Sequence, residues 1–427
     1  MKSFFPEIDL ANLYTKVCFG YMIAMLNFYS YGIRFAGPAL RISDLFVLIL
    51  VVIGILLGIE RKVINGYFKI LALIVGPFLF LEMTLPIIGL FVYSYGHIFN
   101  GPRIAFLYLP LTFIALFFRK DELKELNRLF EVALKWTIGL NLVFGILQLL
   151  AIYDIVPRQV LLQYHLQHFA VDGHFRVFDG IRVSGLRSTS TALSMVGIVG
   201  LSHFIAKILK KSIIKDWIFL LLSILIILLT ASRVAILLLP ILIGASLLIA
   251  PINKKRKGKL FLMILGGFSG ILFALNLTGE FDRMFARIFR LFNDFSNDVS
   301  MNTRNNLWSR ALERSSDFPY GTLSPPTLSI GLIDSGYLTY YLQGRWLFIS
   351  TLLLFLGGAF FFSVRAVFKK KGDFHTNIFF MNIIIYTSVA MIFFNSVRSA
   401  TVIFALLLGL INTLSNSNIE LNVDEGT

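Results

Sequence analysis

The chain has 427 residues, of which 57% are hydrophobic and only 15% are charged, and its mean hydropathy is +0.78. A soluble protein of this length carries about a quarter charged residues, so the composition excludes an ordinary soluble enzyme. The net charge of +15 does not indicate nucleic-acid binding, because the basic residues form short clusters between apolar runs and no separate basic domain exists.

Long apolar runs recur along the whole chain. A helix that crosses the hydrocarbon core of a bilayer, about 30 Å thick, needs about 20 mainly apolar residues. The runs predict an all-α polytopic membrane protein with about twelve transmembrane helices, organised as a single transmembrane domain over 1–427. The run from 214 to 250 is interpreted as two helices joined by a tight turn at Thr230–Arg233. The predicted spans are 13–31, 43–60, 67–85, 103–118, 133–152, 189–207, 214–231, 234–250, 260–278, 345–364, 377–395 and 399–414.

Lysine is confined to one set of connecting segments. The segments that follow even-numbered spans carry lysines, whereas those that follow odd-numbered spans carry none. Lysine-rich loops stay on the cytoplasmic side during insertion. Both termini are therefore predicted to be cytoplasmic, with 415–427 as a polar cytoplasmic tail.

Arginine is distributed differently, since 16 of the 21 arginines fall at or near the outer face in this topology. Arginine on the translocated side runs against the insertion bias. A guanidinium is always charged and donates a planar fork of hydrogen bonds that matches phosphate oxygens, so the set indicates a diphosphate site. The alternative is that these side chains extend to lipid headgroups or pair with interfacial acids.

Two of the predicted outer-face loops are long, at 153–188 and 279–344. The second begins with a stretch of helical periodicity that predicts an amphipathic helix lying in the membrane surface. Its apolar face consists of Phe281, Met284, Phe285, Ile288 and Phe292, and its basic face of Arg283, Arg287 and Arg290.

Three short segments combine arginine with small and polar residues. They are Arg182-Val-Ser-Gly-Leu-Arg187 before the sixth span, Ser232-Arg233 at the predicted turn, and Arg304-Asn-Asn-Leu-Trp308 with Asp334-Ser-Gly-Tyr-Leu338 further along. This order resembles the O-antigen ligase and polymerase superfamily. In that family an Arg-x-x-Gly segment, a Ser-Arg pair, an Arg-x-x-x-Trp segment and a His-Asn-x-x-Leu or Asp-Ser-x-x-Leu element follow one another. The resemblance covers roughly residues 180–360.

One departure separates the members of that superfamily. The ligases that transfer finished polymer to lipid A carry a histidine where this chain has Asp334. The chain is therefore more similar to the Wzy-type O-antigen polymerases, which join repeat units on an undecaprenyl diphosphate carrier. Arg310 and Gly321 fit the Arg-x10-Gly spacing described for these polymerases, although chance alone also produces such a spacing.

The resemblance implies roles for eight residues. Asp334 would be the catalytic base or would orient the acceptor hydroxyl, unless it forms a structural salt bridge to an arginine. Tyr337 would stack on a sugar, unless it is an interfacial tyrosine. The expected diphosphate-binding residues are Arg233, Arg304, Arg182 and Arg187, and the expected substrate-binding residues are Tyr337, Arg310 and Arg176.

The function implied is a GT-C-like O-antigen polymerase in the bacterial inner membrane that acts at the periplasmic face. Donor and acceptor would both be undecaprenyl-diphosphate-linked oligosaccharides, with membrane lipid and a chain-length regulator protein as further partners. No cofactor, metal or nucleic acid is expected, although the three-residue spacing of His165 and His168 is one that metal ligands on a helix can have. The alternatives are an O-antigen ligase and a flippase for the lipid-linked oligosaccharide.

Overall fold

The computed structural model describes residues 9–28, 32–34, 39–62, 64–93, 100–157, 159, 183–187, 189–277, 279, 299–324, 330, 333–369 and 373–416. Within these ranges the chain forms thirteen α-helices and one short two-stranded hairpin. The all-helical architecture expected from the apolar runs is therefore confirmed.

Twelve of the helices coincide with the twelve segments predicted to span the membrane. The first six are α1 (Leu10–Asn27), α2 (Ile42–Arg61), α3 (Phe68–Tyr93), α4 (Asn100–Phe117), α5 (Lys120–Ile152) and α7 (Ser190–Lys210). The other six are α8 (Ile214–Leu229), α9 (Arg233–Ile249), α10 (Lys254–Leu277), α13 (Gly336–Phe368), α14 (Phe374–Ala390) and α15 (Ala400–Asn416).

By length and composition, six of these helices can cross a membrane, namely α2, α3, α5, α7, α10 and α13. Shorter apolar stretches within α4, α9, α14 and α15 accompany them. The total of twelve crossings, the GT-C likeness and the two long outer loops stay predictions.

The predicted break in the long apolar run is confirmed. Helix α8 ends at Leu229 and α9 begins at Arg233. Between them Ala231 adopts a φ of +46°, and the Thr230 hydroxyl donates a 2.7 Å hydrogen bond to the Ile227 carbonyl. The left-handed residue reverses the chain within the few residues that separate the two helices.

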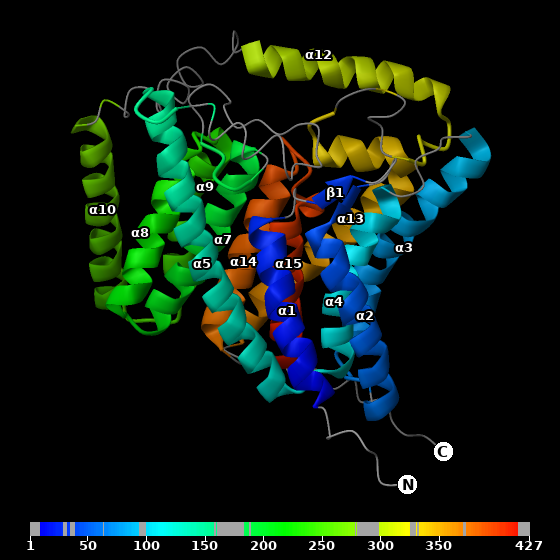
Figure 1. The fold of residues 1–427 in the computed structure, drawn as a ribbon, viewed down its shortest axis with the longest axis horizontal. Helices are drawn as coiled ribbons and strands as arrows, with labels where there is room; N and C mark the ends of the chain where they lie inside the picture. The colour runs from blue at the N-terminus through cyan, green and yellow to red at the C-terminus, as the bar shows by residue number, and fades with distance from the viewer. Residues whose placement is uncertain are drawn as a thin grey trace.

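The helices form a bundle with two different ends (Figure 1). Helices α7, α14 and α15 lie inside and bury residues on all sides, whereas α2 and α10 lie at the edge with most of their apolar residues exposed. Helix α12 (Val299–Arg314) lies across one end of the bundle. The basic starts of α5 and α10 and the last residues of α15 lie at the other end, which we call the lysine face.

A small hairpin between α1 and α2 departs from the all-α prediction. Strands β1 (Gly32–Arg34) and β2 (Ala39–Arg41) pair antiparallel, with Gly32 opposite Arg41. A Cβ atom on Gly32 would lie 2.2 Å from the Leu40 carbonyl oxygen, so the close pairing requires glycine. Strands of three residues give no alternating pattern long enough to detect in the sequence.

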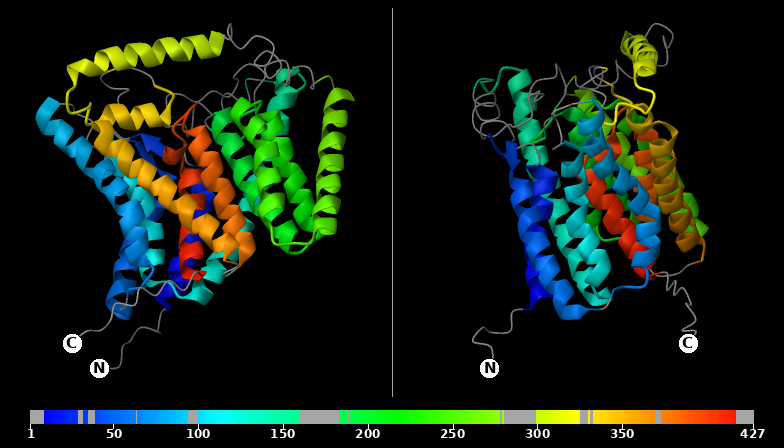
Figure 2. Two further views of the ribbon diagram at one scale, coloured as in Figure 1. Left: turned by 180° about the vertical axis from the view of Figure 1, so that it is seen from behind. Right: turned by 90° about the vertical axis from the view of Figure 1, so that its right-hand side faces the viewer.

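Helix α13 is broken near its start. Gly344 and Arg345 have non-helical backbone angles, and φ of Arg345 is +53°. Figure 2 shows a short first segment below α12 and a long segment that runs down the bundle. The predicted span began at residue 345, so its start coincides with this kink. The preceding residues 336–343 are helical although they belong to the predicted loop 279–344.

Candidate active site

The chain that follows α12 is fastened to the kink of α13 by one arginine. The Arg345 guanidinium donates to the Ser315 carbonyl, to the Ser315 hydroxyl at 3.2 Å and to the Phe318 carbonyl at 2.5 Å. A planar guanidinium fork can bond several acceptors at once. The strained backbone of Arg345 thus places its side chain where it fixes the end of α12 over the bundle.

A close backbone contact supports the same arrangement. The Thr322 amide donates to the Leu342 carbonyl at 2.8 Å, and the Leu323 amide donates to the Gln343 carbonyl at 2.9 Å. Gly321 has a φ of +86°, and a Cβ atom there would lie 2.6 Å from the Gln343 carbonyl oxygen. Only glycine combines this φ with this approach at low cost.

The central contact of the site joins residues 30 positions apart. Arg304 Nε donates to Asp334 Oδ2, and Trp308 Nε1 donates to Asp334 Oδ1 at 3.0 Å. Arg304 and Trp308 are four residues apart, so both project from one face of α12. The guanidinium carbon of Arg304 also lies 5.7 Å from the centre of the Phe393 ring. The Arg304 and Asp334 side chains are 29% and 26% exposed, which leaves them accessible to a ligand.

Asp334 is positioned by the start of α13. Ser335 is the N-cap of that helix, and the Gly336 and Tyr337 amides donate to the Met391 carbonyl at 2.8 and 3.3 Å. The Tyr337 hydroxyl donates to the Ser388 carbonyl at 2.9 Å. These bonds tie the residues directly after Asp334 to the end of α14, so the carboxylate sits on a fixed part of the backbone.

Arg187 lies in a different environment. Its side chain is 4% exposed, and Nη1 donates to the Met25 and Leu26 carbonyls at 2.8 Å each. These carbonyls belong to the last turn of α1, whose orphan acceptors the guanidinium satisfies. In this structure Arg187 anchors the segment before α7 to α1. Its role in diphosphate binding, which the resemblance implies, stays a prediction.

The remaining expected residues are spread more widely. Arg233 is half-buried and is the first residue of α9, next to the N-cap Ser232. Arg310 is exposed on α12. Several predicted features lie outside the described residues, namely Arg176, Arg182, the histidines His165 and His168, and the predicted amphipathic helix over 281–292.

The structure shows one helix and one hydrogen-bond partner that the sequence did not predict. Helix α12 was not predicted, although the four-residue spacing of Arg304 and Trp308 is compatible with a helix face. The Tyr340 hydroxyl also donates a 2.9 Å hydrogen bond to Glu82, an acid on α3 that is completely buried. No local pattern links Glu82 to Tyr340 across so much of the chain.

A protein-family model matches the segment that carries Arg233, Arg304 and Trp308. Residues 218–325 match the family model described as O-Antigen ligase. The match supports the resemblance to the O-antigen ligase and polymerase superfamily, a glycosyltransferase-like class. Together with the apolar helices it points to a multi-pass membrane protein. None of the curated proteins compared with the chain matches it.

Proposed function

We propose that this superfamily member is an O-antigen polymerase. It would join undecaprenyl-diphosphate-linked oligosaccharide repeat units by glycosyl transfer at the periplasmic face of the inner membrane. The observation that carries the proposal is the contact of Arg304 and Trp308 with Asp334. This contact brings a guanidinium, a group that commonly binds phosphate, next to the Asp334 carboxylate. Both lie at the end of the bundle opposite the lysine face.

The reaction requires few chemical groups from the protein. A hydroxyl oxygen of the acceptor unit attacks C1 of the first sugar on the donor, and the bond from C1 to the phosphate oxygen breaks. Undecaprenyl diphosphate leaves with the bonding electron pair. Asp334 receives the proton of the hydroxyl, so charge and atoms balance. Since the diphosphate is already a good leaving group, positioning and electrostatic stabilisation supply most of the rate.

Arg304 would couple binding of the donor diphosphate to release of the Asp334 carboxylate. Its guanidinium now pairs with Asp334, and a diphosphate is a stronger partner because it offers more charge and more acceptor oxygens. Exchange of Arg304 from Asp334 to the diphosphate would free one carboxylate oxygen for the acceptor hydroxyl. The Trp308 indole would keep hold of the other oxygen, so that the carboxylate keeps its orientation. Arg233 would add a second guanidinium to the diphosphate.

Asp334 also favours the polymerase over the ligase, although the matched family model bears the ligase description. The ligases resemble one another in having histidine at this position. A flippase for the same lipid-linked unit would need access from both faces and often shows internal repeats, and the sequence shows no such repeat.

Deletion of the gene, followed by gel electrophoresis of the surface polysaccharide, tests the proposal. We expect the lipid core to carry a single repeat unit, because transport and ligation continue without polymerisation. A bare core with polymer retained on the undecaprenyl carrier would instead identify the ligase. A bare core without any externally exposed lipid-linked unit would identify the flippase.

A further inference from the structure

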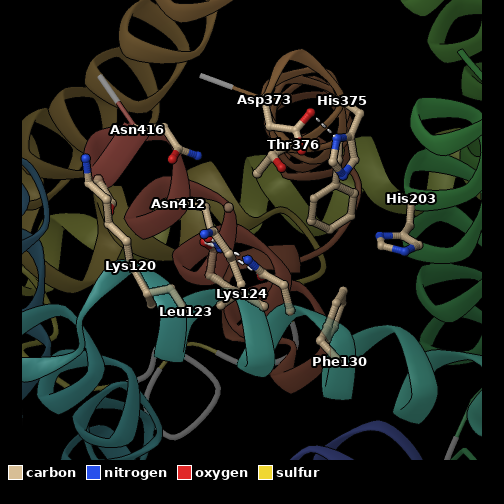
Figure 3. A pocket seen from close by; sticks show the side chains of 15 residues that line it. Lys120, Leu123, Lys124, Phe130, His203, Asp373, His375, Thr376, Asn412 and Asn416 are labelled. Carbon is tan, nitrogen blue, oxygen red and sulfur yellow. Dashed lines mark hydrogen bonds and ion pairs between the residues drawn. The ribbon is translucent and has the colours of Figure 1, made fainter. Parts of the chain in front are cut away.

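A pocket of about 320 Å³ opens at the lysine face, at the end of the bundle opposite α12. Its walls are the start of α5, the start of α14 and the end of α15, with His203 of α7 at one side (Figure 3). Lys120 and Asn416 lie on one side of the opening, and Asp373 and His375 lie on the other. None of the proposed catalytic residues lines this pocket.

Five of the residues that line the pocket carry an amide or a hydroxyl group. Asn127 and Asn412 bond each other reciprocally, at 2.6 and 2.9 Å, and so join α5 to α15 in the wall of the pocket. Thr376 and Ser415 add hydroxyls. These neutral groups both donate and accept, which suits a ligand that carries hydroxyl groups of its own.

The described lining carries two lysines, Lys120 and Lys124, and one carboxylate. Within the part of the chain that the structure describes, that carboxylate is Asp373, and its partners are Lys210 and His375. Lys210 Nζ lies 2.6 Å from Asp373 Oδ2, and His375 Nδ1 lies 2.6 Å from Asp373 Oδ1. Burial raises the pKa of Asp373, but the bonds from His375 and Lys210 outweigh burial and hold the pKa below its usual value.

Lys124 Nζ also lies 2.8 Å from Asp121 Oδ1, in a pair whose side chains are 77% and 91% exposed. Such an exposed pair contributes little stability, so an anion in the pocket can replace Asp121 as the partner of Lys124. Lys120 supplies a second ammonium group on the same helix.

The volume of the pocket and its position on the lysine face indicate a small, negatively charged ligand. A pocket of this volume is at the lower end of the range, about 300–1,000 Å³, that small-molecule sites occupy. The start of α14, a helix of 17 residues, faces the pocket and adds the partial positive charge of its N-terminus. Basic pockets between helices on the cytoplasmic side of membrane proteins are suited to phosphorylated headgroups.

We propose that this pocket binds a phosphate ester of a polyol. Lys120 and Lys124 would hold the phosphate, while Thr376 and the Asn127–Asn412 pair would bond the hydroxyl groups. The ester is either the headgroup of an anionic glycerophospholipid or a free polyol phosphate. The site does not depend on the polymerase proposal, because it shares no residue with it.

The test uses the full chain, purified in detergent, with two probes. Radiolabelled glycerol 3-phosphate measures binding of a free ester, and native mass spectrometry with added phosphatidylglycerol counts bound lipid. We expect Lys120→Ala/Lys124→Ala to weaken binding by at least about tenfold, since each lysine supplies a charge-assisted bond. We expect Lys120→Arg/Lys124→Arg, which keeps the charges, to bind within about threefold of the parent chain.

A matched pair of lysines controls for general charge attraction. Lys254→Ala/Lys255→Ala removes the same charge from the start of α10 on the same face, outside the pocket, and should leave binding unchanged. Thr376→Val should weaken glycerol 3-phosphate binding but not inorganic phosphate binding. Binding of the lipid alone or of the free ester alone would support the proposal and identify the source. Equal losses in both lysine pairs, or no binding of either probe, would overturn it.

Discussion

Two carboxylates at opposite ends of the bundle have similar exposure but different partners. Glu131, near the lysine face, bonds Lys135 at 2.5 Å and Lys207 at 2.7 Å, and its other oxygen lies 3.7 Å from His203. Its side chain is 21% exposed. Asp334 is 26% exposed, and among the described residues its partners are the cation Arg304 and the neutral indole of Trp308.

The two carboxylates differ in how far their charge balance depends on a single cationic partner. Glu131 lies in a network across α5, α7 and α8, in which Lys207 also lies 3.3 Å from Asp216. A ligand that removed one cation from this network would leave another in place, as suits a structural contact. Removal of Arg304 changes the charge balance of Asp334 at once, as suits a contact that a substrate switches. Substitutions at the two ends should therefore differ in whether they affect activity or stability.

The largest expected effect is on activity at the Asp334 end. Arg304→Ala should reduce polymer formation by about a hundredfold to a thousandfold, because a positioned donor to a developing negative charge supplies about 2.7–4 kcal/mol. Complementation of the deleted strain and the ladder of polymer lengths on a gel measure this. The protein should still be present at the parent level, since Arg304 is partly exposed. Glu313→Ala, an exposed change on the same helix, is the control, and normal polymer from Arg304→Ala would contradict the diphosphate role.

The next effect is on stability at the Glu131 end. Lys207→Met should lower the free energy of unfolding by about 3 kcal/mol, because it leaves the buried Asp216 without this partner. Lys135→Met is the matched variant, since it removes another partner of Glu131 but not of Asp216, and should cost under about 1 kcal/mol. Thermal unfolding in detergent measures both. Equal losses would mean that Glu131 and not Asp216 determines the cost.

A smaller effect separates orientation from charge at Asp334. Trp308→Phe keeps an aromatic ring on α12 but removes the indole N–H that bonds Asp334 Oδ1. We expect a loss of about tenfold in polymer formation, corresponding to one hydrogen bond of about 1–1.5 kcal/mol. Trp346→Phe changes an exposed tryptophan on α13 and should have no effect. Unchanged activity in Trp308→Phe would show that Arg304 alone orients the carboxylate.

The smallest effect is a pH-dependent one on the lysine face. The pKa of Asp373 is held below its ordinary value of 3.8, so its pairs with Lys210 and His375 stabilise the fold above that pH. This stability is lost as the pH falls through the lower pKa of the folded protein. Asp373→Asn should therefore lower the free energy of unfolding at neutral pH, which is measured as a lower unfolding temperature. The loss should be under about 1 kcal/mol, because the carboxylate is partly exposed. The difference from the parent should shrink near about pH 3. An exposed acid in Asp317→Asn serves as the control, and a difference that persists in acid would contradict the ion-pair explanation.

The bundle was largely predictable from the sequence, whereas the site was predictable only in part. Apolar runs located twelve helices because each run must be buried or face lipid, and the Thr230–Arg233 turn followed from the length of one run. Helix α12 was not predicted, because it has no long apolar run and is held in place by contacts such as that of Trp308 with Asp334. The sequence placed Arg304 and Asp334 in one loop, but no spacing rule connects residues 30 positions apart.

The arginines show most clearly which part of the site the sequence does not predict. In the sequence Arg187 and Arg304 look alike, since each lies in a short polar segment next to small residues. In the structure Arg187 is buried against two backbone carbonyls, and Arg304 pairs with a carboxylate that remains accessible. Whether an arginine anchors the chain or faces a ligand depends on tertiary neighbours, which residue type and topology do not specify.

Gly321 has a consequence for how this protein tolerates sequence change. Its positive φ and its approach to the Gln343 carbonyl leave no room for a methyl group. A saturation library at this position should return glycine alone, even though the residue touches neither Arg304 nor Asp334 in the reaction proposed above. The glycine of the Arg310 to Gly321 spacing is therefore explained by the shape of the backbone, and a pattern that looks like a recognition motif can record a chain reversal.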